Sequence, residues 1–195
     1  MHRVQIRRPR ANTQTAAEFA RTGEWKTGPE NYLTGQQRKE EIDDVERELQ
    51  GLTRQNFPRT NNLEFAVLKA HLIVEYAITQ YIRCFSHVVI EPKDLKFSFS
   101  QKVQAAYLLG LGAYDPLTLP VIDALNKCRN QVAHSFVLDR NAVDALLRMN
   151  IESPQNFKPV SDRERIKVLR ALTDWLSTNI AANIAGSFWL ATREA

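Results

Sequence analysis

The sequence contains no long hydrophobic run. No window approaches the roughly 18 uninterrupted apolar residues that a membrane-spanning helix requires, so we expect no membrane span. Several arginines occur near the start of the chain, but no continuous apolar segment follows them, which argues against a secretory signal peptide. These two absences lead us to expect a cytoplasmic protein.

Cysteine is also scarce, because only Cys84 and Cys128 occur among 195 residues. Both fall on segments that we interpret as buried helices, where a thiol acts as a small hydrophobic group in a reducing compartment. A disulfide between them is the alternative. The cysteines and the four histidines show no zinc-type spacing, and HExxH, paired CxxC and glycine-rich phosphate-loop motifs are absent. We therefore predict no metal ion and no nucleotide cofactor.

The overall composition indicates one folded domain with an appendage. The chain is 44% hydrophobic and 25% charged, which supplies enough apolar material for a substantial core. Its net charge is +4 and its pI is near 9.2. Because basic and acidic residues are interspersed along most of the chain, this charge favours an anionic partner only weakly. The composition permits RNA binding without requiring it.

The appendage is a polar, basic arm at residues 1–35, which Gly23, Gly28, Pro29 and Gly35 interrupt. We expect one short helical piece near residues 16–21. The arginines of the arm could contact RNA phosphates or an acidic partner, or the arm could be a solvated tail. Because a free tail would expose Trp25 and Tyr32, we expect part of the arm to dock on the domain or on a second subunit.

Residues 36–54 carry apolar side chains at three- and four-residue spacing in a charged background, which predicts an amphipathic helix with a narrow apolar stripe. The stripe consists of Ile42, Val45, Leu49 and Leu52. It could pair with its copy as a short coiled coil, but it spans barely two heptads, so we expect it to pack on its own domain. We assign residues 36–60 to this helix and a linker, and residues 61–195 to a helical domain.

Residues 63–85 form the most apolar segment and predict a central, buried helix. His71 and Glu75 are four residues apart, so they share a face of this helix and can form a hydrogen bond. Glu75 is the only acid beyond the first turn of the helix. Because a buried carboxylate needs a partner, we expect Glu75 to pair with Arg83, Arg129 or His71.

Start and stop signals predict four further helices. A serine caps the first (Ser98 or Ser100), an Asp-Pro pair opens the second, a short amphipathic pattern marks the third, and a Ser-x-x-Glu capping box begins the last. Their expected ranges are about 101–110, 117 or 120 to 136, 139–149, and 161 to beyond 183. All of these patterns together predict an all-α fold.

The stretch at residues 126–134 sets Arg129, Asn130 and His134 close together in a segment that otherwise has the pattern of a core helix. Arginine carries a permanent charge and a planar set of donors that suits phosphate oxygens, while histidine can accept and return a proton near neutral pH. This combination is able to hydrolyse RNA without a metal ion.

The spacing Arg129-Asn130-x3-His134 resembles the R-x4–6-H signature of the HEPN superfamily in its R-N-x3-H form. The resemblance covers roughly residues 60–190, because the apolar helix at 63–85 and the segment at 102–106 follow the order that the family uses. Proteins of this kind are helical bundles that dimerise, set their motif helices side by side and in many cases cut RNA. The resemblance therefore implies an HEPN-like bundle that is a homodimer through the motif helix.

The resemblance also implies a function, that of a metal-independent endoribonuclease with a defence or toxin role. The 2′-hydroxyl of the RNA would attack the adjacent phosphorus and leave a 2′,3′-cyclic phosphate and a 5′-hydroxyl, so DNA would be spared. His134 would act as general base or acid, Arg129 would stabilise charge on the phosphate, and Asn130 would position one of them. Glu75 would orient Arg129 or His134, as acids on this helix do in similar proteins.

An ideal helix does not put Arg129 and His134 on one face. At about 100° per residue, His134 lies about 140° from Arg129 but close to Asn130. The arginine could reach around the helix, the helix could loosen after Asn130, or the working pair could be assembled from two subunits across a two-fold axis. We favour the last, because the far side of this helix is polar and the apolar stripe faces the bundle. That stripe consists of Val121, Leu125, Cys128 and Val132.

Four alternatives or extensions follow from the resemblance and the motif. In one subset of relatives an antitoxin modifies a tyrosine two residues after the histidine; here that position is Phe136, so we expect any antitoxin to act by binding. A non-catalytic regulator or scaffold on the same fold, similar to the mannitol-repressor branch, is the alternative function. A DNA-binding regulator that uses the arginine arm is a third. The motif could also be a core arginine beside a surface histidine.

Overall fold

The computed structural model describes residues 35–86, 96–135, 137–149, 157–159 and 161–193, with side chains described as far as residue 186. Within these ranges all regular structure is helical, which confirms the all-α prediction. The helices are α2 (Gly35–Asn56), α3 (Leu63–Phe85), α4 (Phe99–Leu108), α5 (Thr118–Ser135), α6 (Arg140–Arg148) and α7 (Asp162–Arg193). The predictions for the arm before Gly35 and for Phe136 lie outside the described residues.

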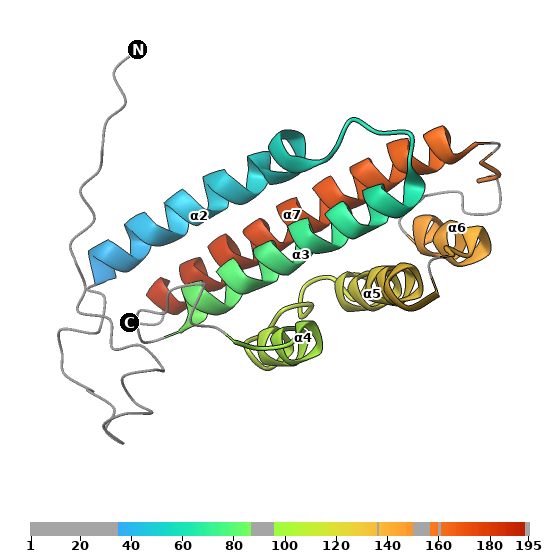
Figure 1. Cartoon of the computed structure of the whole chain (residues 1–195). Helices are drawn as coiled ribbons and strands as arrows, with labels where there is room; N and C mark the ends of the chain where they lie inside the picture. Colours follow the sequence, from blue (N-terminus) through green and yellow to red (C-terminus); the bar gives the residue numbers. More distant parts are fainter. Residues whose placement is uncertain (1–34, 87–95, 136, 150–156, 160, 194–195) are drawn as a thin grey trace, which may run out of the picture.

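Three long helices, α2, α3 and α7, run alongside one another and form the centre of the bundle (Figure 1). The shorter helices α4, α5 and α6 follow one another along the side of α3. Helices α4 and α5 pack on α3, and α6 packs on α5 and α7. The motif helix α5 is therefore a peripheral helix whose inner face is held by α3.

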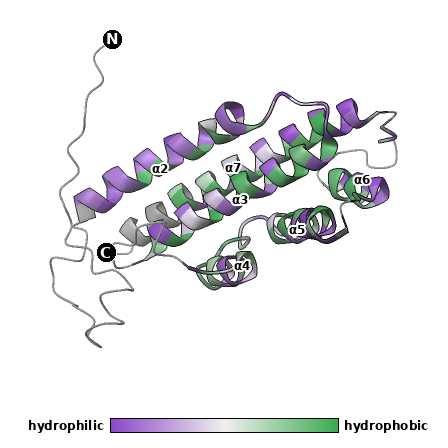
Figure 2. Cartoon of the chain, in the orientation of Figure 1, coloured by the Kyte–Doolittle hydropathy of each residue, from purple (hydrophilic) through white to green (hydrophobic). Residues whose placement is uncertain are grey.

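Helix α2 belongs to the same bundle as the helices that follow it. All four residues of its predicted apolar stripe are buried, and the helix packs on both α7 and α3. In Figure 2 its visible outer side is mainly hydrophilic. Arg38 Nη2 donates to the carbonyl oxygens of Cys84 (3.1 Å) and Ser86 (3.2 Å), which joins the start of α2 to the end of α3. These contacts confirm that the amphipathic helix packs on its own domain.

Helix α3 is the most deeply buried part of the described chain. Small side chains recur along it, and Ala66, Val67, Ala70, Val74 and Ala77 have no exposed surface. Short side chains at these positions allow the neighbouring helices to approach closely, since protein interiors are close-packed. The prediction of a central buried helix at residues 63–85 is confirmed to the residue.

The predicted start signals of the other helices also operate. Ser98 forms a capping box with Gln101, Asp115 Oδ1 accepts from the Leu117 amide just before α5, and Ser161 Oγ accepts from the Glu164 amide. The Asp139 side chain also caps α6 by accepting from the Asn141 amide, a cap that we did not predict. Helix α4 ends at Leu108, and the turn after it contains Gly110 and Gly112, whose φ angles are 98° and 88°. Because side chains disfavour this left-handed region, glycine suits both positions.

The cysteines behave as small core residues. Both are free and buried, so the disulfide alternative is wrong. Burial raises the pKa of Cys84 to about 12 and that of Cys128 to about 11, which keeps both thiols protonated at neutral pH. None of the described helices combines the length and the apolar character needed to cross a membrane.

Leu49→Ala should lower the free energy of unfolding by about 2–5 kcal/mol, because it removes a side chain that is 1% exposed from the α2 part of the core. Leu72→Ala is the matched control, since it removes the same atoms from a side chain that is 55% exposed, and it should cost less than about 1 kcal/mol. Urea denaturation followed by circular dichroism measures both. An unchanged main transition in Leu49→Ala would show that α2 does not share the core.

Candidate functional site

The motif helix α5 is held against the bundle by the apolar stripe that the sequence predicts. Val121, Leu125 and Cys128 are buried, and Val132 is partly buried against the core. The helix runs without interruption to Ser135. The loosening after Asn130 that we considered from the sequence is therefore wrong, and the motif residues keep regular helical positions.

The three motif residues separate into two groups in a single chain. Arg129 and Asn130 are half-buried, and Arg129 Nη1 donates to Asn130 Oδ1 at 3.0 Å. His134 is exposed. In the described part of the chain, no hydrogen bond joins His134 to Arg129 or Asn130. The arginine does not reach around the helix to the imidazole, so one chain alone does not bring them together.

Glu75 pairs with a residue that we did not consider from the sequence. Its Oε1 atom lies 2.7 Å from Lys102 Nζ, and its Oε2 atom lies 4.0 Å from His71 Nδ1. Arg83, which we considered as a partner, instead pairs with Glu41 at 2.8 Å. Of the three expected partners only His71 is near, and among the described contacts none joins Glu75 directly to Arg129.

His71 links the Glu75 pair to the motif helix. Its imidazole is 3% exposed and packs on the Phe99 ring with centroids 4.2 Å apart. Nε2 lies 3.2 Å from Asn126 Oδ1. Because an amide oxygen only accepts, Nε2 carries the proton and donates it to this bond. The network therefore spans α3, α4 and α5, and it ends one helical turn before Arg129.

The electrostatics of this network keep His71 neutral. Burial lowers its pKa, and the positive charges of Arg129 and Lys102 lower it further. The carboxylate of Glu75 and the bond to Asn126 act in the opposite direction but do not outweigh burial. The positive charge of Arg129 therefore acts on the buried His71 imidazole.

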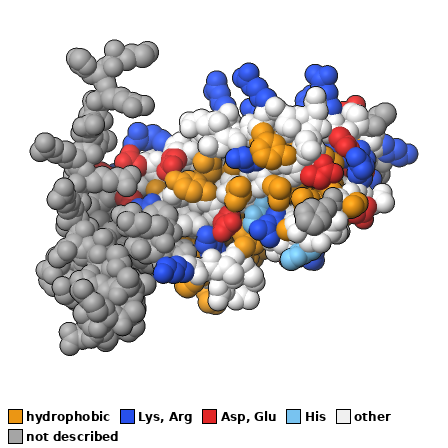
Figure 3. Space-filling model, viewed as in Figure 1, with side chains coloured by type: hydrophobic (Ala, Val, Ile, Leu, Met, Phe, Trp, Pro, Cys, Tyr) orange, Lys and Arg blue, Asp and Glu red, His pale blue; other side chains and the backbone are white. Residues whose placement is uncertain are grey.

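Sequence reasoning missed two members of this network, Lys102 and Asn126. Lys102 is the only charged residue of α4, which was a usable signal for a partner of the lone acid on α3. Asn126 is three residues before Arg129 and so lies on the same face of α5. Figure 3 shows acidic, basic and histidine side chains gathered where α3 meets α4 and α5.

The arrangement suits anion binding beside a proton-transfer group. Lys102 and Glu75 neutralise each other, whereas no acid among the described residues forms an ion pair with Arg129. The Arg129 charge is therefore available to an incoming anion, and Asn130 can offer its amide group beside it. No cluster of three or more potential metal ligands occurs within the described residues.

Comparisons of this chain with protein-family models, with curated proteins and with solved structures gave no match.

The protein should become less stable as the pH falls below about 6.5, the usual pKa of histidine. Burial lowers the pKa of His71 in the folded chain, so the unfolded chain binds more protons in this range. The expected slope is up to about 1.4 kcal/mol per pH unit. Chemical denaturation between about pH 7.5 and about pH 5.5 measures it in wild type and in His71→Asn.

His71→Asn should show a shallower pH dependence than wild type. Thr53→Val serves as the control, because it alters a buried side chain that does not titrate. This control should retain the wild-type slope even if its stability changes. Equal slopes in wild type and His71→Asn would contradict a buried neutral imidazole.

Proposed function

We propose that this chain is a metal-independent endoribonuclease of the HEPN type, with a defence or toxin role. Two residues of α5 carry the proposal. Arg129 has no acidic partner among the described residues, and His134 on the same helix is exposed. A fixed cation and an accessible imidazole are the two groups that metal-free RNA cleavage needs. The order of helices around α5 is compatible with the resemblance drawn from the sequence.

In the proposed mechanism the RNA supplies the nucleophile. The 2′-hydroxyl attacks the adjacent phosphorus and loses its proton to an imidazole, and the bond to the 5′-oxygen breaks. That oxygen receives a proton, which yields a 5′-hydroxyl and a 2′,3′-cyclic phosphate. His134 acts as base or acid, and Arg129 binds the phosphate oxygens on which negative charge gathers. Asn130 positions the Arg129 guanidinium through their hydrogen bond.

Glu75 takes an indirect part in this mechanism. It holds Lys102 and lies beside His71, whose bond to Asn126 reaches the turn of α5 that precedes Arg129. We therefore regard Glu75 as a residue that positions the motif helix rather than one that touches the RNA. This role is less direct than the orientation of Arg129 or His134 that we expected from the sequence.

Dimerisation through α5 completes the proposed site. In one chain His134 is separate from the Arg129–Asn130 pair, so a second copy that meets α5 could bring its own histidine to that pair. Exposed apolar side chains at the end of α4 and on both flanks of α5 support a covered surface near this helix. They include Tyr107 (62% exposed), Leu108 (83%), Leu117 (43%) and Val137 (71%).

Purified wild-type protein should cleave single-stranded RNA in the presence of EDTA, and His134→Ala should reduce the rate about 100- to 10,000-fold, because proton transfer is lost. Arg129→Ala should reduce it about 100-fold or more. Gel analysis gives the rates, and mass spectrometry identifies the 2′,3′-cyclic phosphate. Arg47→Gln is the matched control, since it removes an exposed cation of α2 that pairs with Asp44 and lies outside α5, and it should retain activity.

Two results would contradict this assignment. Retained cleavage in His134→Ala would remove the assigned site, and cleavage of an oligonucleotide with 2′-deoxyribose at every position would exclude 2′-hydroxyl attack. Wild-type protein that binds RNA without cutting it would favour the non-catalytic regulator.

Mixed dimers test the shared site. Equal amounts of Arg129→Ala and His134→Ala subunits, unfolded together and refolded, should recover about a quarter of the wild-type activity, because half of the dimers are mixed and each mixed dimer holds one intact Arg–His pair. Each variant refolded alone gives the baseline. If the mixture stays at that baseline while light scattering shows mixed dimers, the two groups do not act across the interface.

A further inference from the structure

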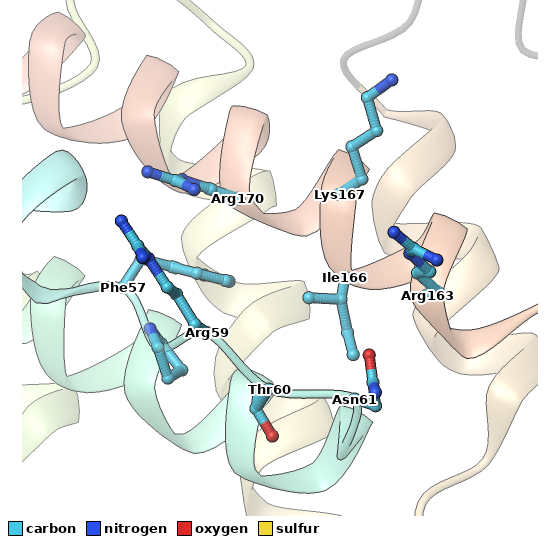
Figure 4. Close-up of a pocket in the computed structure, with 9 residues that line it drawn as sticks. Phe57, Arg59, Thr60, Asn61, Arg163, Ile166, Lys167 and Arg170 are labelled. Atoms are coloured by element: carbon cyan, nitrogen blue, oxygen red, sulfur yellow. The ribbon is translucent and has the colours of Figure 1, made fainter.

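A second basic site lies at the end of the bundle where α2 leads into α3 and where α7 begins. The linker that follows α2 and the first turns of α7 enclose an open cleft of about 550 Å³ (Figure 4). Phe57 and Ile166 lie along it but are largely buried, and Thr60 and Asn61 supply polar groups. Helix α5 does not line this cleft, so it is distinct from the candidate site at Arg129.

Four cations line the cleft, and no acid does. They are Arg59, Arg163, Lys167 and Arg170. Several basic residues elsewhere in the described chain pair with acids, as in Arg83–Glu41 at 2.8 Å and Arg165–Asp144 at 2.8 Å, although Arg129 does not. None of the four cleft cations forms an ion pair with a described acid. Like charges that converge without compensation favour binding of an anion.

The cations are spaced along the cleft rather than gathered at one point. Arg163, Lys167 and Arg170 follow one another at four- and three-residue intervals, so they form one stripe along about 10 Å of α7. In Figure 4 the guanidinium groups of Arg59 and Arg170 point toward one end of the cleft, and Arg163 lies at the other. An extended chain of anionic groups fits this stripe better than a single small anion.

We propose that this cleft binds the phosphate backbone of single-stranded RNA, an assignment that rests on the proposed ribonuclease function. Guanidinium groups match phosphate oxygens in a bidentate geometry, and a stripe of about 10 Å spans more than one backbone phosphate. Phe57 is 6% exposed and so offers no face on which a base could stack. The cleft therefore contributes affinity without sequence preference, and Arg129 and His134 carry out the chemistry.

The binding test compares two double variants in a His134→Ala background, which prevents cleavage of the probe. The probe is a fluorescein-labelled oligouridylate, and fluorescence anisotropy gives Kd in EDTA at several salt concentrations. Lys167→Gln with Arg170→Gln should raise Kd about tenfold. It should also reduce the slope of log affinity against log salt by about 1.4, because two phosphate contacts are lost.

Lys39→Gln with Arg47→Gln is the matched control. It makes the same change in net charge at exposed positions of α2, away from the cleft, and should change Kd less than about twofold. Equal weakening by both double variants would overturn the proposal, since it would reflect net charge alone. Polyglutamate that displaces the probe as effectively as unlabelled oligouridylate would overturn the assignment to phosphates.

Cleavage kinetics separate this proposal from the proposed function. With His134 intact, Lys167→Gln with Arg170→Gln should raise KM about tenfold and leave kcat near wild type, because the cleft binds RNA away from the reacting phosphate. A fall in kcat with unchanged KM would overturn the cleft assignment. RNA binding that depends on the cleft in a protein that never cleaves would support the cleft and refute the nuclease.

Discussion

The burial of α3 is the constraint on which the rest of the structure depends. This helix packs on α2, α4, α5 and α7, and its alanine and valine positions have no exposed surface. The few polar groups that α3 carries into these contacts must therefore find partners on other helices. His71 and Glu75 do so through Asn126 and Lys102, which ties the motif helix and α4 to the centre of the bundle. Packing and polar pairing thus fix the position of α5 together.

Local sequence signals predicted the helices well. The bounds of α3 and the serine cap at Ser98 follow from spacing and from residues that interact within a turn or two. Such signals involve neighbours in the chain, so a single sequence contains them. Partners that come from different helices are harder to predict, because periodicity gives the face of a helix but not the helix that it meets. The Glu75–Lys102 pair is of this kind.

Partners from different helices were also hard to predict at the candidate site on α5 and at the basic cleft beside α7. The stripe Arg163, Lys167 and Arg170 is visible in the sequence, but the cleft depends on Arg59, which approaches from the linker after α2. Conversely, the helical wheel correctly separated Arg129 from His134, and the unbroken α5 helix keeps them apart. If α5 meets a second copy, the two halves of the motif belong to one site only in the assembled dimer. Activity would then depend on protein concentration as well as on the residues themselves.

The turn between α4 and α5 has a consequence for how this motif can vary. Gly112 has a φ angle of 88°, and a methyl group added there would lie 3.0 Å from the side chain of Leu119, in the first turn of α5. Any larger residue would press on the start of the motif helix while also straining its own backbone. Position 112 is therefore closed to most substitutions, and the turn that leads into the motif helix can vary less than the exposed turns of the bundle.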